Sequence, residues 1–102
     1  MASSSPADDS AGELLRERDR VVDRLRSMAL ADVPNDAVRR AAQHLEDLAA
    51  DVRGEPARTV PELAPYAAGD QMSVLVGELA AAPAEVVADA TRTLAELRAA
   101  LP

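Results

Sequence analysis

The sequence lacks cysteine, tryptophan, phenylalanine, lysine and isoleucine, and Tyr66 is its one aromatic residue. Without cysteine, neither a disulfide framework nor thiol chemistry is possible. No apolar run approaches the roughly 18 residues that a membrane-spanning helix needs, so we expect no membrane partner. Residues 1–9 have neither the basic nor the apolar segment of a signal peptide, which favours a cytoplasmic protein.

The charged residues are mostly acidic. The 102 residues include 18 Asp and Glu against 11 Arg, which gives a net charge of −7. Binding of nucleic acid draws on clustered Lys and Arg, so this composition disfavours a nucleic-acid partner. The abundance of alanine, arginine, aspartate, valine and leucine is typical of a GC-rich bacterial genome.

The apolar core that this chain can form is thin. Hydrophobic residues make up 48% of the sequence, but nearly half of them are alanine. Burying one large apolar side chain contributes on the order of 1.5–3 kcal/mol, whereas ordering one residue costs roughly 1.5 kcal/mol. We therefore expect a homodimer or a protein partner to complete the core.

The first helix has a recognisable start signal. Ser10–Glu13 is a capping box, in which the two outer side chains each satisfy an orphan backbone N–H. Leu14 and Val21 then open an apolar stripe with a seven-residue spacing. This pattern predicts a helix from Ser10 to about Ala31, preceded by a disordered tail over residues 1–9.

The second helix is marked at both ends. Asn35 or Asp36 suits its N-cap, and Gly54 suits its C-terminal cap. The apolar residues between them fit the 3.6-residue period without a gap: Val38, Ala41, Ala42, Leu45, Leu48, Ala49 and Val52. Because only a few residues separate the first two helices, they are predicted to form an antiparallel hairpin.

Three prolines exclude a continuous helix over residues 54–68, and this segment is interpreted as a packed connection. A third helix is expected from about residue 67 or 70 to residue 81. Its small residues Ser73, Gly77 and Ala81 would let another helix approach closely.

Pro83 suits the first position of a fourth helix, which would reach the C-terminus. Residues 10–102 are thus predicted to be a single all-α domain. The expected architecture is a small four-helix bundle built from two antiparallel helical hairpins.

The only histidine, His44, shares a helix flank with Asp47 and Asp51. One imidazole and two carboxylates form a conceivable metal site. Such spacings are also common on any polar helix face, and no second histidine exists to complete a typical zinc site. We therefore expect neither a metal nor another cofactor.

No catalytic residues are predicted. The carboxylate pairs Glu13/Glu17 and Glu46/Asp47 are candidates for acid–base chemistry, but they fall on helix faces predicted to be exposed, where no desolvation shifts their pKa. The sequence has no glycine-flanked serine elbow and no glycine-rich phosphate loop. We therefore expect a protein that is not an enzyme.

Four residues are candidates for contact with a partner. Arg18 lies on the apolar stripe of the first helix, where it either covers the core with its stem or pairs with a partner's acid. Tyr66 and Leu63 lie in the proline-rich connection, and Met72 follows on the third helix. Tyrosine is enriched in interface hot spots, and the alternative for Tyr66 is a plug at the end of the bundle.

The sequence thus predicts a non-enzymatic helical interaction module that self-associates and exposes an apolar strip as a monomer. One alternative is a small ligand-binding bundle, with a closed pocket of roughly a few hundred Å³ near Tyr66 and Met72. A third possibility is a DNA-binding regulator, in which Arg39 and Arg40 would start a recognition helix, although Asp36 on the same helix repels phosphate.

Overall fold

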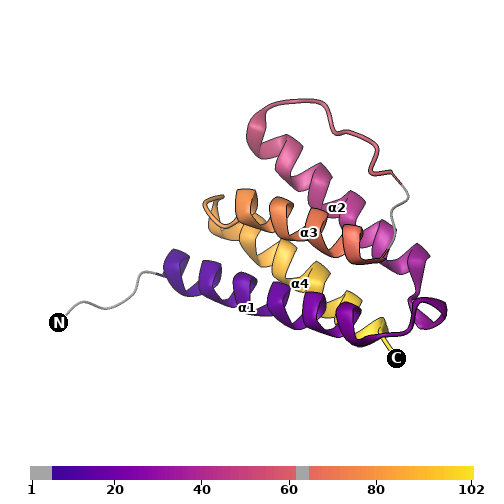
Figure 1. The fold of residues 1–102 in the computed structure, drawn as a ribbon. Helices are drawn as coiled ribbons and strands as arrows, with labels where there is room; N and C mark the ends of the chain where they lie inside the picture. The colour runs from indigo at the N-terminus through magenta and orange to yellow at the C-terminus, as the bar shows by residue number, and fades with distance from the viewer. Residues whose placement is uncertain (1–5, 62–64) are drawn as a thin grey trace.

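The computed structural model describes residues 6–61 and 65–102, without the side chains of residues 6–8, 65 and 66. The helices are α1 (Pro6–Ser27), α2 (Asn35–Arg53), α3 (Pro65–Leu79) and α4 (Ala84–Ala100), with a 3₁₀ turn, η1 (Leu30–Asp32), after α1 (Figure 1). Across the described ranges there is no strand. The predicted all-α four-helix bundle is confirmed.

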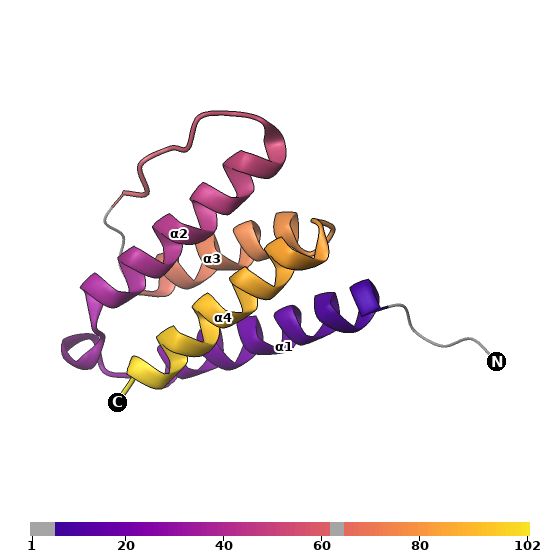
Figure 2. The same ribbon diagram turned by 180° about the vertical axis from the view of Figure 1, so that it is seen from behind.

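The packing partners differ from those expected of two hairpins. α1 packs on α3 and α4, and α2 packs on the same two helices, so that α1 and α2 lie across a diagonal of the bundle. The most extensive contact is between α1 and α4, which run in the same direction (Figures 1 and 2). The short turns after α1 and α3 reverse the chain as predicted, but the helices that they join are not the closest partners.

The connection between α2 and α3 explains this arrangement, because it returns along α2. The side-chain amide of Gln43 accepts a hydrogen bond from the N–H of Val60 at 2.8 Å and donates one to the carbonyl of Arg58 at 2.9 Å. Val60, which belongs to the connection, is buried, as expected of a segment that packs on the core. α3 therefore starts beside the start of α2 and runs parallel to it.

α1 begins at Pro6, so the prediction of a helix start at Ser10 is wrong. Proline suits the first turn because its missing N–H would have no helical partner there, and the acid Asp9 complements the positive end of the helix dipole. Of the tail predicted over residues 1–9, only residues 1–5 lie outside the described part. α1 ends at Ser27 and not at about residue 31, since η1 interrupts it.

The predicted end of α2 is confirmed. Gly54 adopts a left-handed conformation with φ of 71°, and its N–H donates to the carbonyls of Ala50 and Asp51. Glycine reaches this conformation without the steric cost that a Cβ atom brings. In the short turn after α3, Pro83 is the N-cap residue of α4, whereas the sequence predicted it at the first helical position.

The core is one continuous cluster to which all four helices contribute. Alanines at the helix contacts, such as Ala42 and Ala90, let the backbones approach closely, and both are almost fully buried. The largest fully buried side chains are Leu14, Leu45, Met72, Leu79, Leu94, Val21, Val76 and Val87. The interior is therefore formed by leucine, valine, methionine and alanine.

Leu94→Ala is expected to lower the free energy of unfolding by about 2–5 kcal/mol, because it leaves a cavity at a fully buried position. Val74→Ala, at a position that is 64% exposed, is expected to change it by less than about 0.5 kcal/mol. Urea denaturation followed by circular dichroism measures both values. Equal effects of the two substitutions would contradict the burial of Leu94 in the core.

Candidate functional site

Glu17 of α1 is buried, although the sequence predicted an exposed helix face there. Its side chain is 4% exposed. The carboxylate accepts a hydrogen bond from Nε of Arg98 on α4 at 2.6 Å and another from Arg20 at 2.9 Å. This ion pair joins the two helices that contact each other most, whereas Glu13 is exposed as predicted.

The surroundings of Glu17 stabilise its charged form. Burial by itself raises the pKa of this carboxyl, but the hydrogen bonds from Arg98 and Arg20 and their positive charges outweigh burial, so the pKa is lowered from its ordinary value. A general acid needs a raised pKa. The arrangement is thus that of a structural ion pair.

A second buried carboxylate lies on α2, next to an arginine that reaches α3. Glu46, also predicted to be exposed, has a side chain that is 6% exposed and accepts two hydrogen bonds from Arg53, at 2.8 and 3.1 Å. The same guanidinium pairs with Glu78 on α3 at 2.5 Å. The hydrogen bonds that Arg53 donates to Glu46, and then the one to Glu78, raise the pKa of Arg53 above its ordinary value.

Of the four candidate partner residues, the structure describes the side chains of Arg18 and Met72. Arg18 pairs with the adjacent Asp19 on its own helix at 2.9 Å, so the ionic contact between helices uses Glu17 instead. Met72 is fully buried in the core. Leu63 lies outside the described residues, and Tyr66 is described only as part of the backbone of α3.

His44 is paired across the bundle. Its Nε2 lies 2.9 Å from Oδ1 of Asp89 on α4, whereas Asp47 on its own helix accepts a hydrogen bond from Gln43. His44, Asp47 and Asp51 therefore do not surround a common point that a metal ion could occupy. Within the described residues, no three potential His, Asp or Glu ligands converge on one position.

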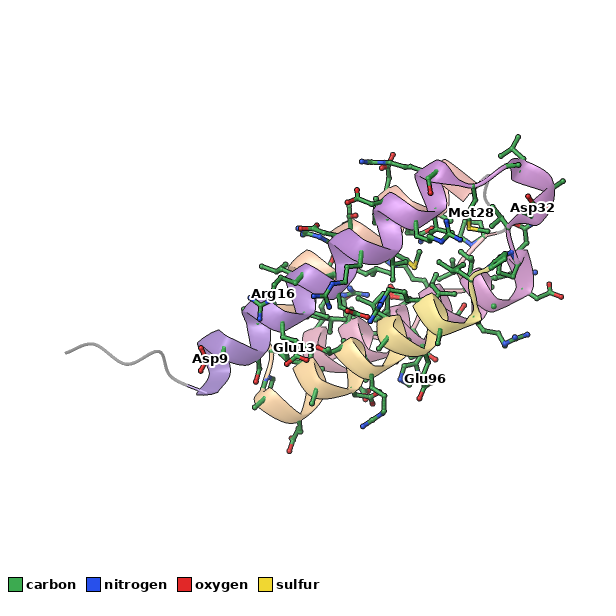
Figure 3. The ribbon with its side chains drawn as sticks, turned by 90° about the horizontal axis from the view of Figure 1, so that it is seen from below. Asp9, Glu13, Arg16, Met28, Asp32 and Glu96 are labelled. Carbon is green, nitrogen blue, oxygen red and sulfur yellow. The ribbon has the colours of Figure 1, made fainter. Side chains whose placement is uncertain are left out.

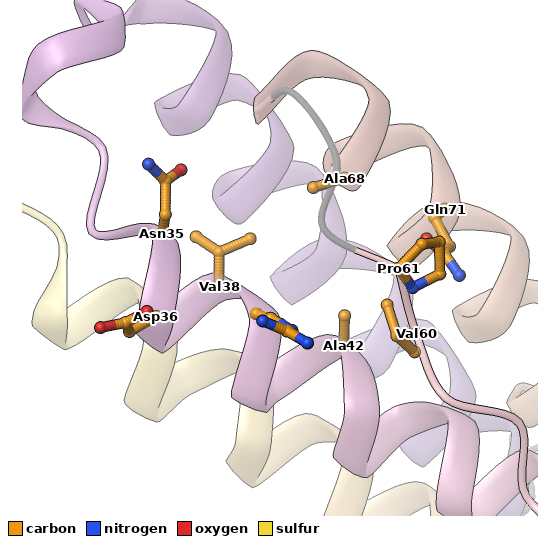
Figure 4. A pocket seen from close by; sticks show the side chains of 9 residues that line it. Asn35, Asp36, Val38, Ala42, Val60, Pro61, Ala68 and Gln71 are labelled. Atoms are coloured by element: carbon orange, nitrogen blue, oxygen red, sulfur yellow. The ribbon is translucent and has the colours of Figure 1, made fainter.

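A small cavity lies between the start of α2, the returning connection and α3 (Figure 4). Its volume is about 20 Å³, which is room for one water molecule. Oε1 of Gln71 is buried there and has no hydrogen-bond partner among the described residues, so a water molecule would suit it. The ligand-binding alternative predicts a closed pocket of roughly a few hundred Å³, which is far larger than this cavity.

The exposed large apolar side chains are Leu30 on η1, Val52 on α2 and Val74 on α3. They belong to three different elements, so in the described part of the chain they do not form one long apolar strip. Small residues are also exposed, since Gly77 on α3 has open space where a Cβ atom would be. Ser73 of the predicted small-residue face is half-buried and bonds the carbonyl of Gly69.

No protein-family model, no curated protein and no solved structure matches this chain. None of the described helices is both long and apolar enough to cross a membrane. The surface of the bundle is therefore the basis for an argument about function.

The stability of the bundle is expected to depend on Glu17 in acid. Because the pKa of this carboxyl is lowered on folding, its contribution is complete above the pKa of about 4.3 in the unfolded chain and is lost as the pH falls through the folded value. Glu17→Gln should lower the free energy of unfolding by about 1–3 kcal/mol at neutral pH and flatten its dependence on acidic pH.

Urea titrations between neutral and acidic pH measure this dependence. The exposed Glu13→Gln is the matched control, and it should follow the wild-type profile. An acid profile of Glu17→Gln that runs parallel to that of the wild type would show that Glu17 does not contribute as described.

Proposed function

We propose that this chain is a non-enzymatic helical interaction module that self-associates, with α1 of one copy antiparallel to α1 of a second copy. The observation that carries the proposal is the distribution of charge along the outer face of α1. Asp9 and Glu13 lie in its N-terminal half, and Arg20 and Arg24 lie in its C-terminal half, all four exposed. Figure 3 views the bundle from the side of this helix.

The four residues recur at helical spacing, so they share one face of α1. They are also placed symmetrically, because Asp9 and Arg24 lie at equal distances on either side of the midpoint of the segment, and so do Glu13 and Arg20. A two-fold axis through that midpoint would set Asp9 against Arg24 of a second copy and Glu13 against Arg20. A two-fold interface requires such self-complementarity.

The neighbouring helix supports a close approach on the same side. α4 packs on α1 and carries a line of alanines at helical spacing, of which Ala84, Ala88 and Ala99 are exposed and Ala95 is half-buried. Side chains of this size leave little bulk between a helix and a second copy. The contact between copies would thus combine charged pairs on α1 with small side chains on α4.

The strength of this association can be bounded. Exposed ion pairs contribute about 0.2–1 kcal/mol each and are screened by salt. The proposed interface contains each of two pairs twice, so it supports a weak, reversible dimer. Its dissociation constant should increase with ionic strength.

The solution mass, measured by light scattering over a concentration series, tests self-association. At low ionic strength the mass is expected to rise from that of a monomer towards that of a dimer, and added salt should reverse the rise. A monomeric mass at every concentration and at low salt would overturn the proposed function.

Charge reversal tests the proposed pairing. Asp9→Arg or Arg24→Glu alone sets like charges against each other and should weaken the dimer about tenfold. The double variant restores the pairs in the opposite sense and should recover the wild-type mass profile. Asp36→Arg and Arg39→Glu, at exposed positions of α2, are matched controls that should leave the profile unchanged.

A further inference from the structure

We infer that a basic amphipathic helix of another protein docks on an apolar patch formed by Leu48, Val52, Ala82 and Val86, here called the end patch. It lies where the end of α2 meets the start of α4. This inference goes beyond the proposed function and does not rest on it, because the end patch uses neither the outer face of α1 nor a second copy.

The apolar stripe of α2 continues beyond the part of the helix that the bundle covers. Leu45 and Ala49 are almost completely buried. Leu48 is only half-buried, and Val52, in the last turn, is 46% exposed. After that last turn the chain leaves α2 into the long connection to α3 (Figures 1 and 2). The sequence thus continues the apolar stripe to a position that the described residues cover only in part.

α4 provides the other half of the end patch. The pair His44–Asp89 fixes the level at which the antiparallel helices α2 and α4 meet. One turn further along α2, Leu48 reaches the level of Val86 in the first turn of α4. Val52 follows one turn beyond Leu48, and Ala82 lies in the turn that precedes α4. Val86 and Ala82 are partly buried against the core. The end patch is therefore continuous with the hydrophobic interior.

The charges around the end patch identify its partner. Asp51 on α2 and Glu85 on α4 are exposed, and neither forms an ion pair with any residue that the structure describes. Asp47 is a third exposed acid on the same stretch of α2. A second copy related by a two-fold axis would set these acids against their own equivalents, whereas arginines or lysines would complement them.

The shape of the end patch favours a helix as the bound segment. Leu48 and Val52 are one helical turn apart on α2, and on the opposite side Val86 lies in the first turn of α4 with Ala82 in the turn before it. A helix that presents apolar residues at a spacing of three and four can place them along such a line. Basic residues on both flanks of its apolar stripe would then reach Asp51 and Glu85.

The probe for this inference is a synthetic amphipathic helix with leucines at three- and four-residue spacing and arginines beside them. A matched peptide replaces the arginines with glutamates. Binding is measured by isothermal titration calorimetry. Methyl resonances of Leu48, Val52, Ala82 and Val86, followed by NMR on the full chain, report where the peptide binds.

The basic peptide is expected to bind at least tenfold more tightly than the acidic peptide and to shift the methyl resonances of the end patch. Val52→Asp should weaken binding at least tenfold. Val74→Asp is the matched control, because Val74 is an equally small and even more exposed valine on α3, and it should change binding less than twofold.

Three results would overturn the inference: no binding of the basic peptide, equal binding of both peptides, or shifts confined to other surfaces. Equal weakening by Val52→Asp and Val74→Asp would do so as well. None of these results depends on whether the chain is a monomer or a dimer, so they are distinguishable from a failure of self-association. Circular dichroism of both variants verifies that they remain folded.

Discussion

The side chain of Gln43 holds the connection after α2 against that helix, and the course of the rest of the chain depends on this contact. Its two hydrogen bonds, to Val60 and Arg58, lead the backbone back towards the start of α2. α3 must then run parallel to α2, and the short turn after α3 makes α4 parallel to α1. The diagonal placement of α1 and α2 follows from that route, because α3 and α4 occupy the positions between them.

Each of the two parallel helix pairs is joined by an ion pair, and a buried glutamate takes part in both networks. Glu17 meets Arg98 between α1 and α4, and Glu46 binds Arg53, which in turn reaches Glu78 on α3. A buried ion pair is a weak source of net stability, because desolvation offsets much of the attraction, yet removing one partner is costly. The contact between Glu17 and Arg98 thus penalises any packing that separates α1 from α4, and it opposes the hairpin pairing that a generic apolar stripe would also permit.

The outer face of α1 and the end patch differ in symmetry. The outer face of α1 carries acids in one half and bases in the other, so it complements itself under a two-fold axis. The same order also complements the helix dipole, with acids near the N-terminus and bases near the C-terminus. The end patch has the exposed acids Asp51 and Glu85 beside it, which would complement a partner with basic charge. A dimer formed through α1 would leave both end patches free, one on each copy.

The local features of the fold were predictable from the sequence, because they depend on neighbouring residues. The helical periodicity and the left-handed cap at Gly54 are of this kind. The burial of Glu17 was not, since a glutamate next to an apolar stripe is usually solvated and its partner Arg98 is distant in the sequence. The exposure of Val52 was missed for the same reason: periodicity tells which face of a helix is apolar, but only the tertiary structure decides how much of that face the other helices cover.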